Sequence, residues 1–130
     1  MRTLLTSLTV GSVALALTAC GGSDNKNGDT PTLTVKTGQP VHVKASEYKL
    51  RPADIVVEGG GATKFELENG GSLAHNLRVM QEGSDIGGTP TFQGGETKSA
   101  SVALQTGTYE LVCTVGNHAS LGMTAQLTVK

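Results

Sequence analysis

GTYELVCTVGNHASLGM, residues 107–123, begins with the pattern of a strand and ends in a loop that carries three scarce side chains. The strand places alternate residues on one face: Tyr109, Leu111 and Cys113. His118 follows Cys113 by five residues, and Met123 follows His118 by five more. The chain has only two Cys, three His and three Met. Their grouping in one loop therefore indicates a shared site.

The same period-two alternation runs through most of the chain after Pro31 and predicts strands. These are expected over 33–37, 41–46, 54–58, 62–68, 73–80, 96–105, 108–113 and 123–130. Glycine-rich turns separate several of them. The run 82–95 is expected to be a long loop that turns Ile86 and Phe92 inward. No stretch has a helical stripe of useful length, so the pattern predicts an all-β fold, a Greek-key β-sandwich of seven to eight strands.

Composition narrows the class of protein. A chain of 130 residues is expected to contain one domain. Trp is absent and aromatics make up 3% of the residues, so the core must consist mainly of Val, Leu, Ile and Ala. The formal net charge of −1 argues against nucleic-acid binding, which needs a basic face.

The first twenty residues, MRTLLTSLTVGSVALALTAC, have the pattern of a secretory signal, with one basic residue followed by an uncharged apolar run. Leu17-Thr18-Ala19-Cys20 resembles the bacterial lipobox, in which the peptide is cut before a lipidated cysteine. The alternative is a plain secretory signal with a chance cysteine. The lipobox predicts a signal peptide over 1–19, a lipidated Cys20 with a flexible linker over 20–32, and a domain over 33–130. The protein is then anchored on the outer face of a bacterial cytoplasmic membrane or in the cell envelope.

If Cys20 is lipidated, Cys113 has no disulfide partner in the mature chain. Four interpretations of such a thiol are open: a small buried hydrophobe, an intermolecular disulfide, an unselected leftover, or a metal-binding thiolate. The nearby imidazole of His118 and thioether of Met123 favour the metal. Thiolate and thioether are soft donors that suit copper, whereas zinc sites use Cys, His and carboxylates.

A second histidine is needed to complete the two-His, one-Cys plane of a copper electron-transfer site. His42 alternates with Val41 and Val43 and is expected to be a solvated residue of a strand. His75 follows the glycine-rich turn NGGS, where a strand is expected to enter at one end of the sandwich. His75 is therefore the expected fourth ligand.

The sequence resembles the cupredoxins, the small blue copper proteins, over about residues 33–130. The resemblance rests on LAHNL (73–77), on GTYELVCTVGNHASLGM (107–123) and on the closing TAQLTV. It implies one type 1 copper ion held by His75, Cys113 and His118, with Met123 as a weak axial ligand. It also implies a hydrogen bond between Asn76 and Thr114 that joins the two ligand loops. Asn117 departs from many relatives, which have glycine before the histidine.

The resemblance implies electron transfer rather than catalysis, because copper enzymes of this kind add further copper ligands, usually His, and the chain has none to spare. The electron is expected to leave through the edge of His118, with Leu73 and Leu121 on the docking surface. Expected partners are redox proteins such as cytochromes, oxidase complexes or reductase complexes, and the chain is expected to be a monomer. Two alternatives are open: a copper storage or delivery lipoprotein, and a binding module without copper.

Overall fold

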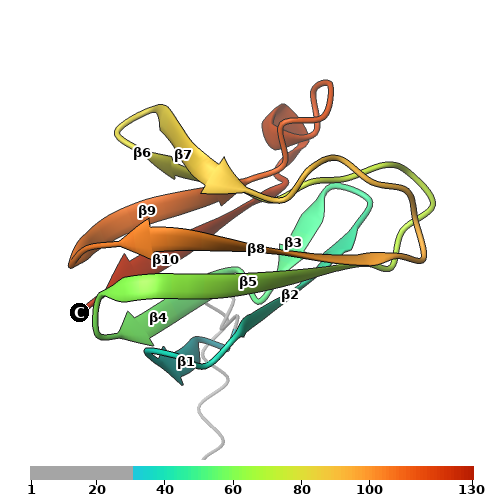
Figure 1. Cartoon of the computed structure of the whole chain (residues 1–130). Coiled ribbons are helices and arrows are strands. Elements are labelled where there is room, and N and C mark those ends of the chain that lie inside the picture. Colours follow the sequence, from blue (N-terminus) through green and yellow to red (C-terminus); the bar gives the residue numbers. More distant parts are fainter. Residues whose placement is uncertain (1–30) are drawn as a thin grey trace, which may run out of the picture.

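The computed structural model describes residues 31–130, which form a β-sandwich (Figure 1). The signal peptide and Cys20 lie outside the described residues. The strands are β1 (Leu33–Lys36), β2 (Val41–Ser46), β3 (Lys49–Arg51), β4 (Asp54–Glu58), β5 (Gly61–Asn69), β6 (Arg78–Gln81), β7 (Ser84–Gly88), β8 (Thr97–Leu104), β9 (Gly107–Val112) and β10 (Thr124–Val129). One short 3₁₀ helix, η1 (Ala119–Leu121), lies between β9 and β10. Within residues 31–130, no helix has the length and hydrophobicity needed to span a membrane.

Two sheets make up the sandwich, as the alternation predicts. One sheet has six strands in the order β1-β4-β10-β9-β6-β7, and the other has four in the order β3-β2-β5-β8. Three pairs are parallel: β1 with β4, β4 with β10, and β2 with β5. The remaining pairs are antiparallel. The prediction of an all-β sandwich is confirmed.

The core lies between the sheets and is built from the alternate positions that the sequence marks as apolar. In β5, Thr63, Phe65, Leu67 and Asn69 are buried, while the residues between them are exposed or half-buried. Val, Leu, Ile and Ala supply most of the rest, as the composition predicts. The Tyr109 hydroxyl group donates to the carbonyl oxygen of Gln105 at 2.9 Å, so this buried ring keeps a partner for its polar end.

Residues 31–130 form ten strands, two more than the eight expected, because the sequence pattern does not reveal β3 and β7. β7 lies inside 82–95, which was expected to be a loop, and its buried and exposed residues do not alternate. Ile86, expected to turn inward, is 38% exposed, because this strand lies at the edge of its sheet. Phe92 is buried as expected. The strand expected over 73–80 is also shorter, since only Arg78–Gln81 forms β6.

Several loops meet at one end of the sandwich, toward the right in Figure 1. They are the turn between β2 and β3, the segment between β5 and β6, the segment that enters β8, and the loop after β9. The N–H of Gly70 donates to the carbonyl of Ala45 at 2.9 Å, so the first two are joined directly. This end contains all the residues expected to bind copper.

Candidate metal centre

His75 is held in place by a backbone bridge to Phe92. The N–H of each residue donates to the carbonyl of the other at 3.0 Å. The bridge lies just before β6, in a segment that the sequence pattern assigned to a continuous strand. The imidazole is thereby fixed inside the end of the sandwich, where it is fully buried.

The loop from Cys113 to Met123 closes on itself. The N–H of Cys113 donates to the carbonyl of Met123 at 3.1 Å, and the N–H of Met123 donates to the carbonyl of His118 at 3.1 Å. Gly116 and Gly122 have φ angles of 49° and 100°, in the left-handed region that favours glycine. The turns expected from these glycines are present. The carbonyl of Asn117 accepts a hydrogen bond from the N–H of Leu121 at 3.2 Å, where the loop enters η1.

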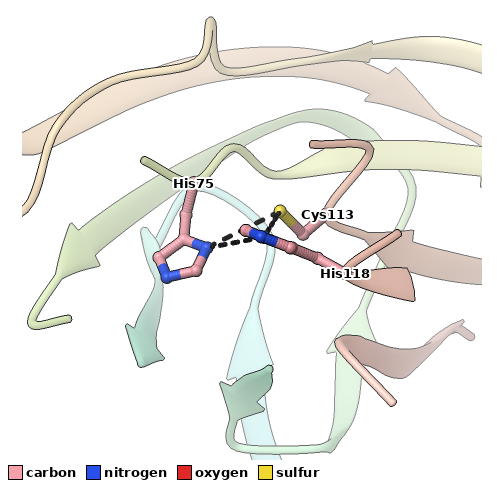
Figure 2. A group of neighbouring side chains, drawn as sticks. All are labelled: His75, Cys113 and His118. Carbon is pink, nitrogen blue, oxygen red and sulfur yellow. Dashed lines mark hydrogen bonds between the residues drawn. The ribbon is translucent and has the colours of Figure 1, made fainter. Parts of the chain in front are cut away.

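Three donor atoms from these two regions converge (Figure 2). The Nδ1 atoms of His75 and His118 lie 3.2 Å apart. The Sγ atom of Cys113 lies 3.8 Å from Nδ1 of His75 and 3.6 Å from Nδ1 of His118. Cys113 and His75 are fully buried, and His118 keeps only 8% of its surface exposed.

The triangle formed by these atoms has the size that a metal ion requires. A point equidistant from corners with these separations lies about 2 Å from each atom, close to the bonds of about 2.0–2.3 Å that nitrogen and sulfur ligands make to a divalent ion such as zinc. Two imidazoles and a thiolate are also the in-plane donor set of electron-transfer copper sites. The residues present therefore fit a copper ion.

Comparison with known families decides the assignment. The family model of copper binding proteins, the plastocyanin/azurin family, matches residues 29–130. This chain belongs to that family. Its cofactor is one type 1 copper ion, the kind that serves electron transfer. No curated protein matches the sequence of this cupredoxin.

Solved structures show the same fold at low sequence identity. Dithionite-reduced auracyanin from Roseiflexus castenholzii has a TM-score of 0.62 at 17% identity, over 70% of this chain and 96% of its own. Auracyanin A, a "blue" copper protein from Chloroflexus aurantiacus, has a TM-score of 0.59 at 20% identity, over 71% of this cupredoxin and 100% of its own chain. Rusticyanin from Thiobacillus ferrooxidans has a TM-score of 0.56 at 20% identity, over 75% and 82%.

The backbone of Met123 is hydrogen-bonded to two of the residues that form this triangle. It is fully buried, and its N–H and carbonyl bind His118 and Cys113 respectively. The four residues expected as ligands in this cupredoxin are therefore gathered at one end of the sandwich. His42 is elsewhere, on β2, where it is exposed, as expected for a solvated residue of a strand. Its Nδ1 atom lies 3.1 Å from Oε2 of Glu66.

Burial keeps His75 neutral. Desolvation lowers the pKa of the His75 imidazole, and the neighbouring His118 lowers it further, while Glu47 acts in the opposite direction. A neutral imidazole keeps a lone pair free for a metal ion. The Nδ1 atom of His75 faces the other donors, whereas its Nε2 atom is buried and has no hydrogen-bond partner among the described residues.

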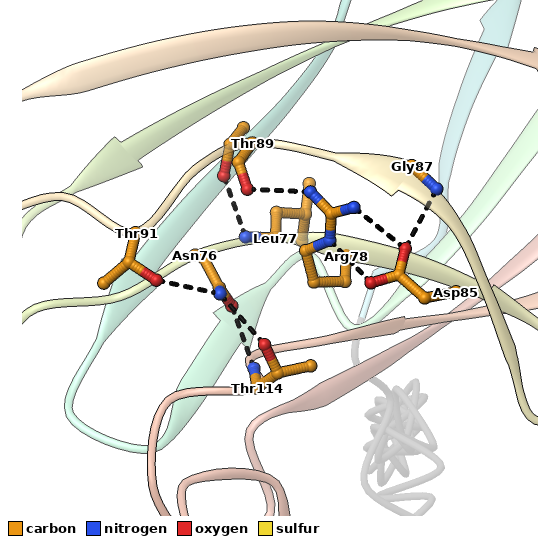
Figure 3. A network of polar contacts seen from close by, with 8 residues as sticks. All are labelled: Asn76, Leu77, Arg78, Asp85, Gly87, Thr89, Thr91 and Thr114. Atoms are coloured by element: carbon orange, nitrogen blue, oxygen red, sulfur yellow. Dashed lines mark hydrogen bonds and ion pairs between the residues drawn. The ribbon is translucent and has the colours of Figure 1, made fainter.

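Asn76 joins the two loops that carry the donors, as the resemblance implies (Figure 3). Its Nδ2 atom donates to Oγ1 of Thr114 at 3.0 Å, and the N–H of Thr114 donates to Oδ1 of Asn76 at 2.8 Å. Nδ2 also donates to Oγ1 of Thr91 at 3.1 Å. Asn76 follows His75 and Thr114 follows Cys113, so these bonds fix the separation of two donor residues.

The network continues to the edge of the six-stranded sheet. The guanidinium of Arg78 donates to both carboxylate oxygens of Asp85, at 2.8 and 2.9 Å, and to the carbonyl of Thr89 at 3.1 Å. The N–H of Leu77 donates to Oγ1 of Thr89 at 3.0 Å. Arg78 lowers the pKa of Asp85, so that carboxylate is ionised at neutral pH. These bonds attach β7 and the segment after it to the chain that carries His75.

Sequence reasoning missed two residues of this site, Glu47 and Tyr48. They form the turn between β2 and β3, and we call them the hairpin tip. The ring of Tyr48 lies edge-on to that of His118. The carboxylate of Glu47 accepts hydrogen bonds from the N–H groups of Ser72 and Leu73, which precede His75 in the chain. Neither residue carries a sequence signal for this role, because the short strand β3 is not evident and the contacts join distant parts of the chain.

Two exposed leucines belong to the regions that carry His75 and His118. Leu73 is 42% exposed and Leu121 is 49% exposed. They come from the two regions that carry the donor residues, one on the His75 side and one in η1. Both residues expected on a docking surface are therefore accessible.

Proposed function

We propose that this cupredoxin carries single electrons between redox proteins outside the cytoplasmic membrane. In this proposal, His75, Cys113 and His118 would hold the copper ion, and Met123 would be the weaker fourth ligand that the family resemblance implies. The observation that carries the proposal is the triangle of buried Sγ and Nδ1 atoms with sides of 3.2, 3.6 and 3.8 Å.

Bound copper supplies a single reversible electron through the Cu(II)/Cu(I) couple. The chain's own residues provide the conditions for that exchange. The buried Cys113 would offer copper a soft sulfur donor, and the neutral imidazole of His75 an intermediate nitrogen donor. The backbone bonds of the loop and the Asn76 clasp hold these donors in place, so a change of oxidation state requires little movement.

The electron leaves through the slightly exposed edge of His118. Leu73 and Leu121, which are both exposed, would form a small docking surface there. A small, partly apolar contact suits brief encounters, and redox complexes have interfaces at the low end of the size range. We propose cytochromes, oxidase complexes or reductase complexes as partners, with this protein acting as a monomeric carrier and not as an enzyme.

Lipidation at Cys20 would hold the carrier close to membrane partners. The lipobox-like Leu17-Thr18-Ala19-Cys20 and the polar segment that follows it support this part of the proposal. A tether raises the effective concentration of the domain at partners in the same membrane. The protein would therefore act on the outer face of the cytoplasmic membrane or in the cell envelope.

Copper storage or delivery is the alternative function for the same residues. Exchange of copper with a partner is favoured by an open site with exposed donors. Here Cys113, His75 and Met123 are fully buried and His118 nearly so. This burial supports electron transfer over delivery.

Addition of Cu(II) to the purified copper-free protein tests the proposal. We expect one copper ion per chain and an intense blue or green thiolate-to-copper absorption that ascorbate removes and ferricyanide restores. Copper is measured by elemental analysis and the band by visible spectroscopy. A folded protein that binds copper without the band would contradict the proposed ligands, and rapid loss of copper to a weak chelator would favour delivery.

Replacing Met123 with leucine tests the axial ligand. We expect the Met123→Leu protein to keep the band and to have a higher reduction potential, because leucine fills the buried space but removes a donor that stabilises Cu(II). The expected rise is on the order of 60 mV, equivalent to a tenfold change in the ratio of the two oxidation states. Potentiometric titration measures it. An unchanged or lower potential would mean that Met123 is not the axial ligand.

A further inference from the structure

The hairpin tip contacts His118 and the turn that leads into His75, although it supplies no donor to the metal centre. Glu47 and Tyr48 lie between β2, which ends at Ser46, and β3, which begins at Lys49. Neither residue belongs to the loops that carry the donors. Their contacts with the metal centre are therefore tertiary and need a reason of their own.

The ring of Tyr48 packs against the imidazole of His118. The ring centroids are 5.1 Å apart and the planes meet at 72°, an edge-on arrangement. Tyr48 is 36% exposed and His118 only 8%, so the tyrosine ring covers part of the imidazole while its own outer surface meets solvent. Its φ of 61° lies in the left-handed region, which is unfavourable for a bulky side chain and persists only where the surrounding structure holds it.

Glu47 holds the turn that leads into His75. Its Oε1 atom accepts hydrogen bonds from the N–H groups of Ser72 and Leu73, the latter at 3.0 Å. Gly71 lies against the same carboxylate, since a Cβ atom there would lie only 2.6 Å from Oε1. These backbone hydrogen bonds lower the pKa of Glu47, so the tip carries a negative charge at neutral pH. That charge and His75 interact electrostatically.

We propose that the hairpin tip sets the reduction potential of the copper from outside the ligand set. Tyr48 keeps water from His118, and a less hydrated site favours the lower charge of Cu(I). The carboxylate of Glu47 favours the higher charge of Cu(II). The two residues therefore act in opposite directions. This inference rests on the proposed function, because it takes His75 and His118 as ligands.

The test is sharp because the two replacements are expected to shift the ratio of Cu(I) to Cu(II) in opposite directions. The copper-loaded full chain, purified in detergent, is equilibrated with the ferricyanide/ferrocyanide couple, so each copper gains or loses one electron against that couple. The fraction of Cu(II) is read from the visible band. In Tyr48→Ala the ratio of Cu(I) to Cu(II) is expected to fall about threefold or more, because water reaches His118. In Glu47→Gln it is expected to rise about threefold, because the negative charge is lost while the acceptor oxygen is kept.

Two matched variants serve as controls. Tyr48→Phe keeps the ring and is expected to leave the ratio unchanged. Glu58→Gln removes a carboxylate before the start of β5, whereas the turn held by Glu47 follows the end of that strand. The two carboxylates are therefore separated by about the length of β5, roughly 25 Å at 3.3 Å per residue, and Glu58→Gln is expected to leave the ratio unchanged. In the copper-free protein, Tyr48→Ala is expected to shift the NMR signals of the His118 ring, because the neighbouring aromatic ring is lost.

Several results would overturn the proposal. These are equal ratios in all variants, shifts of the same sign in Tyr48→Ala and Glu47→Gln, or an effect of Tyr48→Phe as large as that of Tyr48→Ala. A folded Tyr48→Ala protein that has lost the band would show that the ring holds His118 in place instead of setting the potential. Absence of the band from the unmodified protein would refute the proposed function itself. The ratios measured in the variants test only the role of the hairpin tip.

Discussion

The Cys113→Ser protein is expected to show no intense visible absorption after addition of Cu(II). The band arises from charge transfer between the thiolate sulfur and copper, and serine has no sulfur to supply it. Serine is also a poor substitute in the coordination plane, because copper of this kind prefers a soft thiolate. Visible absorption at equal protein and copper concentrations measures the loss, which is expected to be complete.

The replacement must leave the fold intact for this result to be informative. Cys113 is fully buried, and its Sγ lies near two imidazole nitrogens that can accept a hydrogen bond from a serine hydroxyl group. Far-UV circular dichroism should therefore match that of the unmodified protein. His42→Ala serves as the control, because His42 is exposed on β2 and its loss should not alter the band. A band that persists in Cys113→Ser would refute the ligand assignment.

The sequence allowed the sandwich to be predicted because most strands have one face in the core and one in solvent. β2 reads VHVKAS, and its buried and exposed residues alternate as the letters suggest. The metal centre was predictable for a different reason. Cysteine, histidine and methionine are scarce in this chain, so their grouping in 113–123 is conspicuous. The partner of Asn76 came from the family resemblance alone.

Other parts of the structure have no such signal. β7 is an edge strand with two glycines and no buried face, so alternation is absent. Tyr48 meets His118 across a separation of seventy residues, and the meeting depends on the turn between β2 and β3. Sequence patterns report which residues are buried in regular elements. They do not report which turn lies against which loop, and the hairpin tip is a contact of that kind.

Replacing Phe65 with alanine is expected to cost about 3–5 kcal/mol of the free energy of unfolding, the usual range for a buried phenylalanine. Phe65 is fully buried on β5, between Val41 of β2 and Ala100 of β8. Few other large rings are available to fill the space, since the chain has two Phe, two Tyr and no Trp. Urea denaturation of the copper-free protein measures the loss. Ile86→Ala is the comparison, since Ile86 is 38% exposed on the edge strand β7 and should cost clearly less than the fully buried Phe65.

Copper should restore part of this stability without repairing the core. A ligand that binds only the folded state at one hundred times its dissociation constant adds about 2.7 kcal/mol. Phe65 lies four residues before Asn69, roughly 13 Å along the strand, and the donors lie beyond that end of β5. Since separate sites add, we expect the same increment in Phe65→Ala and in the unmodified protein. A smaller increment in Phe65→Ala, by more than about 0.5 kcal/mol, would mean that the core and the metal centre are coupled, so that the sandwich shapes the site. A loss below about 1 kcal/mol in the copper-free variant would contradict the central place of Phe65 in the core.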